Sequence, residues 1–199
     1  MNSTDPDLLL ASASPRRSDL LQQMGVNFTV LAVDIDESRH GDEPPVEFVS
    51  RLAVEKASAG FSRQHGQLPS LGADTIVVCN EQIFGKPQDS QEAEAMLLTL
   101  SGNVHSVYTA VAVDNGQRCA LKVSETLVHF RTITPQECLI YWQTGEPRGK
   151  AGAYAIQGRA GIFVEKLVGS YSGVVGLPLA ETEQLLAEFS VPCWNSGEN

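Results

Sequence analysis

Several sequence patterns that often reveal an enzyme class are missing from this chain of 199 residues. It has no G-x-x-x-x-G-K-[ST] loop, which argues against ATPase or GTPase chemistry of that type. It has no G-x-G-x-x-G turn, the main sign of a dinucleotide-dependent oxidoreductase, and no G-x-S-x-G elbow for acyl transfer. Its chemistry must therefore rest on a different arrangement of side chains.

Metal-binding and redox motifs built on cysteine or histidine are also absent. The four cysteines are widely scattered, with no C-x-x-C pair, and the four histidines lack the H-E-x-x-H spacing of a zinc site. We interpret the cysteines as reduced packing residues of a cytoplasmic protein, and each histidine as a surface or strand residue. These residues are Cys79, Cys119, Cys138 and Cys193, and His40, His65, His105 and His129.

The chain has little positive charge and no long apolar segment. Its formal net charge of −10 argues against a nucleic-acid polymer as partner, because such proteins usually carry a basic face. An anionic ligand would need a local basic pocket and a divalent cation. No stretch approaches the roughly 18 apolar residues of a membrane span, and the acidic first ten residues do not fit a signal peptide. We therefore expect no membrane partner.

Strands and helices alternate along the chain, which predicts an α/β fold. We expect one domain over residues 1–199, with loose tails at 1–7 and 191–199 and without internal repeats. The Asp114-Asn115-Gly116 turn predicts a hairpin, so antiparallel pairing is mixed into the sheet. The expected strands are 8–10, 71–79, 104–113, 121–133 and 162–168, and the expected helices are 15–25, 45–60, 89–101, 134–144 and 177–189.

The turn after the first strand has the features of an anion site. Ser14 and Pro15 predict a helix N-cap followed by proline at the first helical position. Arg16 and Arg17 then lie at the positive end of the helix dipole, which is unfavourable unless an anion binds there. Ser12 adds a hydroxyl donor, and guanidinium groups suit phosphate oxygens. The alternative is an exposed arginine pair beside an ordinary cap.

Two acidic positions are candidates for catalysis or metal binding. Asp74 interrupts an apolar strand, where a carboxylate is costly unless it is paired, hydrogen-bonded or bound to a metal. It is a candidate general base or metal ligand; the alternative is a turn-capping aspartate held by backbone N–H groups. Glu37, in the acidic loop 34–43, is a candidate metal contact or a solvated surface residue. Asp36 competes with it for the metal role.

Three lysines and a glutamine are candidate ligand contacts. Lys56 falls on the apolar stripe of its helix, so it either extends along the helix to reach water or binds phosphate. Lys86 lies in a Gly-Lys-Pro turn and Lys150 in a segment rich in glycine and alanine; both are either solvated or part of a phosphate cradle. Gln157 lies among small residues and could bind a nucleobase edge, although surface glutamines are commoner.

Taken in order, these segments resemble the Maf family of nucleoside triphosphate pyrophosphatases. The resemblance runs from about Leu8 to Leu186, and the ordered set is far more specific than any one piece. The matching segments are S-A-S-P-R-R at 12–17, R-L-A-V-E-K-A at 51–57, G-A-D-T at 72–75, G-K-P at 85–87, L-S-G at 100–102 and K-A-G-A-Y-A-I-Q-G at 150–158.

The resemblance implies an extended mixed β-sheet flanked by helices, with two lobes around a cleft as in inosine triphosphate pyrophosphatases. It implies hydrolysis of a nucleoside triphosphate to the monophosphate and pyrophosphate, with Asp74 as proton acceptor. It also implies a phosphate and metal site served by Mg²⁺ or Mn²⁺, in which Glu37 and Asp74 are the candidate metal ligands. The phosphate-binding positions would be Ser12, Arg17, Lys56, Lys86 and Lys150.

Within that family, Arg16, Thr75 and Gln157 match positions that divide members by substrate. The combination resembles the group that acts on dTTP and UTP, and a glutamine amide suits the O4 and N3–H edge of uracil or thymine. Modified pyrimidine triphosphates and a housecleaning role fit the same group. Two alternatives remain open: a non-catalytic nucleotide sensor in cell-division control, and a phosphatase that releases only orthophosphate. A homodimer is compatible with the sequence, but no surface stripe requires one.

Overall fold

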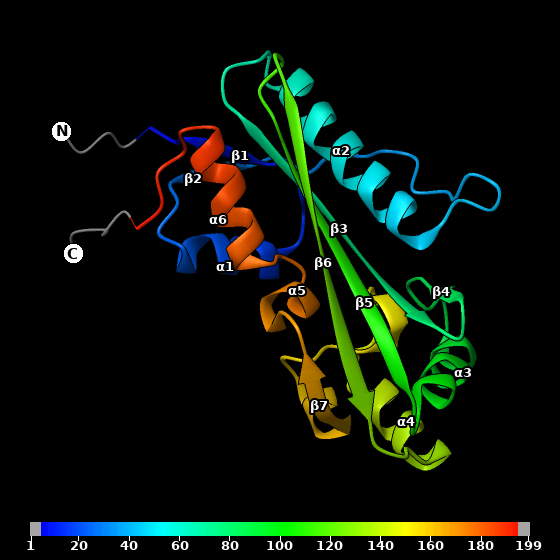
Figure 1. Cartoon of the computed structure of the whole chain (residues 1–199). Helices are drawn as coiled ribbons and strands as arrows, with labels where there is room; N and C mark the ends of the chain where they lie inside the picture. The colour runs from blue at the N-terminus through cyan, green and yellow to red at the C-terminus, as the bar shows by residue number, and fades with distance from the viewer. Residues whose placement is uncertain (1–4, 195–199) are drawn as a thin grey trace. The chain divides into compact units, whose positions relative to one another are not determined.

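A computed structural model describes residues 5–194 of the chain (Figure 1). The strands are β1 (Leu8–Leu10), β2 (Phe28–Val30), β3 (Ser70–Cys79), β4 (Gln82–Phe84), β5 (Val104–Asp114), β6 (Cys119–Phe130) and β7 (Val164–Val168). The α-helices are α1 (Pro15–Gln23), α2 (Pro45–Arg63), α3 (Ser90–Leu100), α4 (Pro135–Gln143), α5 (Tyr171–Val175) and α6 (Leu179–Glu188). Two short 3₁₀ helices complete it, η1 (Ala151–Ala153) and η2 (Arg159–Phe163).

The described strands form one mixed sheet in the order β2-β1-β3-β5-β6-β7, with β4 paired to β3. β1 pairs in parallel with β2 and β3, whereas β3–β4 and β6–β7 are antiparallel. The mixed α/β class predicted from the sequence is therefore confirmed. The chain divides into two compact units, unit 1 (Met1–Asp74, Thr109–Ser124 and Gly176–Asn199) and unit 2 (Thr75–Tyr108 and Glu125–Val175).

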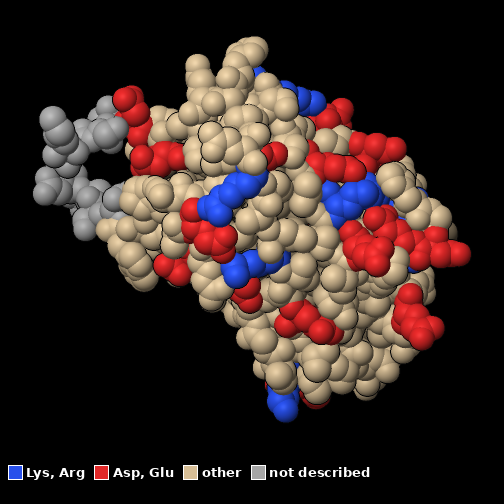
Figure 2. Space-filling view, turned by 45° about the horizontal axis from the view of Figure 1, so that its top comes forward, with Lys and Arg blue, Asp and Glu red and all other residues tan. Residues whose placement is uncertain are grey.

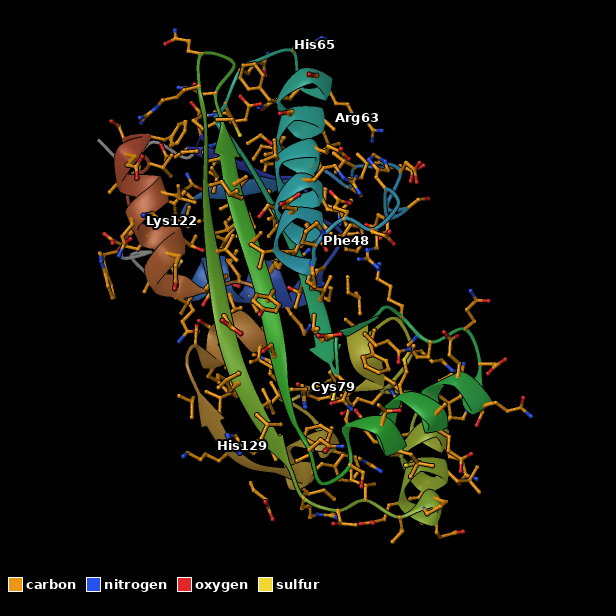
Figure 3. All side chains as sticks on the ribbon, turned by 45° about the vertical axis from the view of Figure 1, so that its right-hand side comes forward. Phe48, Arg63, His65, Cys79, Lys122 and His129 are labelled. Atoms are coloured by element: carbon orange, nitrogen blue, oxygen red, sulfur yellow. The ribbon has the colours of Figure 1, made fainter. Side chains whose placement is uncertain are left out.

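Unit 1 is built on close contact between α2 and the strands β1 and β3. A Cβ atom at Gly72 would overlap the main chain of α2 at Ala53 and Ala57, and one at Gly60 would overlap Ser70 and Ala11. Glycine at these positions lets the helix backbone lie directly on the sheet. Figures 1 and 3 show α2 and α6 on opposite sides of the strands, and Figure 3 labels Phe48 near the start of α2 and Arg63 near its end.

Replacing Gly72 by alanine is expected to lower the free energy of unfolding by about 1–3 kcal/mol. The added methyl group cannot be accommodated by a side-chain rotation, because the atoms it meets belong to the backbone of α2. Chemical denaturation of the variant measures the loss. Gly85→Ala is the matched control, since a Cβ there meets nothing within 4 Å. Equal stability of the two variants would contradict the packing that brings α2 onto β3.

Unit 2 has a core of aromatic and aliphatic side chains between its strands and helices. α3 packs against α4 and η1. Buried Tyr154 contacts Phe130 edge-on, and its hydroxyl lies 2.9 Å from Nε2 of His105. Burial, with a smaller contribution from the charge of His129, lowers the pKa of His105 to about 4. His105 is thus a neutral core residue, and it helps anchor the segment that follows η1.

The structure changes several boundaries expected from the sequence. α2 continues to Arg63, past Gly60, because that glycine serves helix–sheet contact and does not end the helix. β7 begins at Val164 because the preceding residues wind into η2, where Ile162 is 68% exposed. β6 ends at Phe130, whereas the sequence predicted a strand that continues to residue 133. The short strands β2 and β4 were not predicted, since three residues give too little periodicity to recognise.

Helix starts were predicted well, with one correction at Ser14. The capping box of Thr134 and Glu137 is present, and Asp89 accepts the N–H of Glu92 at 2.8 Å. Ser14 occupies the N-cap position of α1, but its side chain makes no capping hydrogen bond. Instead its N–H donates to Ser12 Oγ at 3.2 Å, so the turn is organised around Ser12.

Two other expectations from the sequence concern the domain and its tails. One domain over residues 1–199 stays a prediction. Of the tails expected to be loose, residues 1–4 and 195–199 lie outside the described residues. In the described part, Val191 is buried and the N–H of Trp194 donates to Met24 at 2.8 Å.

Candidate active site

The turn between β1 and α1 joins Ser12 to Arg17. Ser12 is 7% exposed, and its Oγ accepts a hydrogen bond from Arg17 Nη1 at 3.2 Å. Arg17 Nε also donates to the carbonyl of Gly176 at 2.8 Å, which ties α1 to the segment before α6. Arg16, the next residue back on the helix, is half-buried. Arg17 is therefore held in place by these contacts, unlike the exposed arginine considered as the alternative from the sequence.

Lys56 joins the two acidic candidates. Its ammonium lies 2.7 Å from Asp74 Oδ1 and 2.6 Å from Glu37 Oε1. The Lys56 and Asp74 side chains are 9% and 13% exposed, whereas that of Glu37 is 44% exposed. The alternative in which Lys56 extends along the helix to water is wrong, because its side chain is only 9% exposed and its amine contacts the carboxylates of Asp74 and Glu37. Asp74 lies inside β3 and pairs with a lysine, not with turn N–H groups.

The loop that carries Glu37 is fastened to α2 by two arginines. Arg51 bonds both carboxylate oxygens of Glu43 at 2.9 Å and the carbonyl of Ser38 at 2.9 Å. Arg63 donates to the carbonyls of Ala32 and Asp34. These contacts hold the exposed acidic loop close to Lys56, so that Glu37 can reach its ammonium.

Asp36 is the other candidate metal ligand in this loop, and its contacts differ from those of Glu37. Its Oδ1 accepts the N–H of Ser38 at 2.9 Å, a turn-forming bond within the loop. Hydrogen bonding by Ser38 lowers the pKa of Asp36. Glu37, not Asp36, shares Lys56 with Asp74.

Arg17 belongs electrostatically to the same cluster. Burial lowers the pKa of its guanidinium, and the charge of Arg16 lowers it further. The carboxylates of Asp74 and Glu37 act in the opposite direction, which places both within electrostatic reach of Arg17. Unit 1 thus gathers five of the predicted residues in one place, with Arg16 beside them: Ser12, Arg17, Glu37, Lys56 and Asp74.

The remaining candidates lie on unit 2. Thr75 follows Asp74 directly in β3, so the two side chains leave opposite faces of the strand. Lys86 is exposed, and Lys150 donates to the carbonyl of Arg148 at 3.3 Å. The turns that carry the two lysines are linked, because Gly152 N–H donates to the carbonyl of Gly85 at 3.0 Å.

Glycine at position 152 lets the chain approach β3 closely. It has a φ of +67°, and a Cβ there would press on Val77. The segment rich in glycine and alanine that carries Lys150 thus packs against β3 at this point, and two 3₁₀ helices form within and after it. Gln157 follows further along the same segment and is exposed.

The oxygen donors near Lys56 fit a divalent cation only in part. In residues 5–194 no group of three Asp, Glu, His or Cys side chains could hold a metal ion. Glu37 and Asp74 supply carboxylates, and Lys56 already places a positive charge between them. Mg²⁺ typically uses one or two carboxylates together with water and substrate phosphates. The donor set therefore suits a cation that arrives with a polyphosphate.

Figure 2 shows how charged side chains are distributed on one face of the protein. On the face shown in Figure 2, Lys and Arg occur in small groups beside Asp and Glu rather than as a continuous basic surface. No helix within the described residues is long and apolar enough to cross a membrane.

Sequence reasoning missed several residues that organise these segments. Arg51 was noted only as part of a motif, yet it anchors the Glu37 loop. Tyr141 and Glu146 were not singled out, although they contact the segment around Gln157. The only local signal for Glu146 was its place in a Gly-Glu-Pro turn, which does not reveal partners more than ten residues away.

Comparison with known proteins places these residues in a family. The model of the family described as Maf-like protein matches residues 7–189. A dTTP/UTP pyrophosphatase of Saccharophagus degradans is 50% identical, over 96% of this chain and 92% of its own. A dTTP/UTP pyrophosphatase of Salmonella typhimurium is 50% identical, over 92% of this chain and 93% of its own.

Among solved structures, a nucleoside-triphosphatase, dITP/XTP pyrophosphatase, from Mycobacterium abscessus matches with a TM-score of 0.41 and 14% identity. It covers 62% of this chain and 72% of its own. The family model and the relatives at 50% identity span almost the whole sequence, including every segment on which the resemblance was based. The chain belongs to the Maf family.

Proposed function

We propose that this protein hydrolyses dTTP and UTP to the nucleoside monophosphate and pyrophosphate. The relatives at 50% identity named dTTP/UTP pyrophosphatase support this substrate class. The observation that carries the proposal is the partly buried ion pair of Asp74 with Lys56, beside Arg17 and Glu37. It supplies a carboxylate that can accept a proton and cations that can hold phosphate charge.

Asp74 acts as the general base in this scheme. Lys56 engages Oδ1 at 2.7 Å and keeps the carboxylate oriented. Oδ2 takes a proton from the water that attacks the α-phosphorus. The bond from that phosphorus to the bridging oxygen breaks, and pyrophosphate leaves. A positioned general base contributes typically 10²–10⁴-fold to the rate.

The basic residues hold the charge of the triphosphate. Arg17 and Ser12 present a guanidinium and a hydroxyl at the start of α1, where the helix dipole also favours an anion. Lys56 adds its ammonium to this group in unit 1, while Lys86 and Lys150 of unit 2 stay predicted phosphate contacts. Fixed positive groups of this kind stabilise the charge that develops on the leaving pyrophosphate.

Glu37 and Asp74 are the residues proposed to hold a divalent cation, Mg²⁺ or Mn²⁺. When bound, such a cation would supply positive charge to the phosphate oxygens. Both carboxylates contact the ammonium of Lys56, which supports the proposal that they bind one divalent cation together.

Substrate selection is proposed for Arg16, Thr75 and Gln157. An amide side chain can both accept and donate, which suits O4 and N3–H of uracil and thymine. A cytoplasmic location rests on the four free cysteines and stays a prediction, as does a homodimer. Modified pyrimidine triphosphates remain candidate substrates.

A panel of dTTP, UTP, CTP and 7-methyl-GTP, each with Mg²⁺ or Mn²⁺ and with a metal-free control, tests the proposal. We expect pyrophosphate and monophosphate from dTTP and UTP, and loss of turnover without the cation. In ¹⁸O-labelled water, attack on the α-phosphorus places the label in the monophosphate. Orthophosphate alone would identify a phosphatase, binding without turnover a sensor, and a preference for 7-methyl-GTP a different substrate group.

A further inference from the structure

The segment that carries Gln157 is a tight turn. Gly158 N–H donates to the carbonyl of Ala155 at 3.0 Å, which closes a turn over residues 155–158. Gln157 is the third residue of this turn and is exposed. Gly161 N–H then donates to the carbonyl of Gly158 at 3.1 Å, where η2 begins. The position of Gln157 therefore depends on whatever holds the two ends of the turn.

Two side chains from outside the turn hold both ends. The hydroxyl oxygen of Tyr141, in α4, accepts the N–H of Ala155 at 3.1 Å. The carboxylate of Glu146 accepts the N–H groups of Arg159 at 3.0 Å and Ala160 at 3.4 Å. The Tyr141 hydroxyl in turn donates to Glu146 Oε1 at 2.7 Å, which links the two supports.

The turn also rests directly on the Glu146 carboxylate. A Cβ atom at position 158 would overlap all three atoms of that carboxyl group. Glycine at this position lets the main chain lie against the carboxylate, so that the N–H groups of the following residues reach it. The φ of Gly158 is −104°, so the backbone conformation does not require glycine; the close contact with Glu146 favours it.

Tyr141 and Glu146 together form a brace for the turn, and the negative charge of this brace lies on Glu146. Burial alone would raise the pKa of Glu146, but hydrogen bonds from Arg159, Tyr141 and Ala160 hold it below its ordinary value. Burial, with the hydrogen bond to Glu146, raises the pKa of Tyr141 well above its ordinary value. The tyrosine keeps its proton and the glutamate its charge, as the geometry of a hydroxyl donating to a carboxylate requires.

We propose that Tyr141 and Glu146 are positioning residues for substrate selection, because they hold the turn that presents Gln157. The inference rests on the proposed function, in which Gln157 reads the pyrimidine edge. Neither residue contacts the base in this scheme. They set where the Gln157 amide lies, and a displaced amide loses its hydrogen bonds to O4 and N3–H.

Glu146→Gln keeps the size of the side chain and removes one acceptor oxygen and the charge. Two readouts are expected to change. Hydrogen–deuterium exchange should accelerate in peptides covering residues 155–160. The ratio of kcat/KM for UTP to kcat/KM for CTP should fall about 10-fold, roughly the effect of losing a buried hydrogen bond. Most of the change is expected in KM, since the residues of unit 1 that act on the phosphates are untouched.

Tyr141→Phe is the milder second variant, because it removes only the hydroxyl and keeps the buried ring. It should change the same readouts in the same direction and to a smaller extent. Glu165→Gln and Tyr171→Phe are the matched controls. Both residues are exposed, on β7 and α5, and both variants should behave as the wild type.

A double-mutant cycle with Gln157→Ala separates positioning from general loosening. Once Gln157 is removed, Glu146→Gln should cause no further loss of UTP over CTP selection. Additive losses, unchanged selection in both brace variants, or a wild type that does not distinguish UTP from CTP would each overturn the inference. The absence of any pyrophosphate release by the wild type would instead overturn the proposed function.

Discussion

Replacing Asp74 by asparagine is expected to reduce kcat for dTTP and UTP by about 10²–10⁴-fold. Asparagine has nearly the same shape and still offers Oδ1 to Lys56, which donates to that oxygen at 2.7 Å. It cannot take a proton from water at neutral pH. The loss should therefore appear in kcat, measured as the initial rate of pyrophosphate release at saturating substrate.

The fold of the Asp74→Asn variant should persist, because Lys56 keeps its contact with Glu37 at 2.6 Å. Circular dichroism and thermal unfolding check this point. Asp19→Asn is the matched control, since Asp19 is an exposed residue of α1. Full activity in the Asp74 variant would show that the proton goes elsewhere, and would remove the central element of the proposed mechanism.

Replacing Lys56 by methionine is expected to lower kcat/KM on the order of 10²-fold, through loss of a fixed positive charge at the phosphates. It should also lower the free energy of unfolding by about 2 kcal/mol. That cost is below the 3–5 kcal/mol typical when a fully buried pair is broken. The reason is that one partner, Glu37, is 44% exposed and so partly solvated.

The Lys56→Met variant also reports on the proposed cation site without any measurement of turnover. Removing the ammonium of Lys56 leaves the carboxylates of Glu37 and Asp74 near each other without the positive charge that now lies between them. Carboxylate oxygens are ligands that Mg²⁺ and Mn²⁺ accept readily. In the absence of nucleotide, the variant should therefore bind Mn²⁺ more tightly than the wild type, and Mn²⁺ should raise its Tm more.

Electron paramagnetic resonance of free Mn²⁺ and thermal unfolding with and without the ion measure these effects. Lys166→Met is the control for losing one lysine, since Lys166 is exposed on β7 in unit 2. If Lys56→Met binds Mn²⁺ no better than the wild type, Glu37 and Asp74 are not the ligands of the divalent cation.

Much of the secondary structure could be predicted from the sequence, because local chemistry controls it. The capping box at Thr134 acts within four residues, and the apolar run at Leu8–Leu10 forms the buried β1. The short β2 and β4 were missed because their stability comes from neighbours in the sheet and not from their own pattern. The 3₁₀ helices η1 and η2 were missed because such short pieces show no period in the sequence.

In the candidate site too, the sequence marks the residues but the tertiary structure decides their contacts. Asp74 and Lys56 stood out in the sequence because a charge on an apolar strand or stripe must find a partner. That they are each other's partner is a tertiary fact, since 18 positions separate them. It depends on the close approach of α2 to β3 at Gly72.

The sequence by itself determined the α/β class, the family and the residue types at each candidate position, since these follow from local patterns and ordered motifs. Only the tertiary structure decided which charges meet: Lys56 with Asp74 and Glu37, Arg17 with Ser12, and Glu146 with the turn of Gln157. Hydrogen bonds and ion pairs act over about 3 Å. Their partners are therefore set by how distant segments pack, which no local pattern contains.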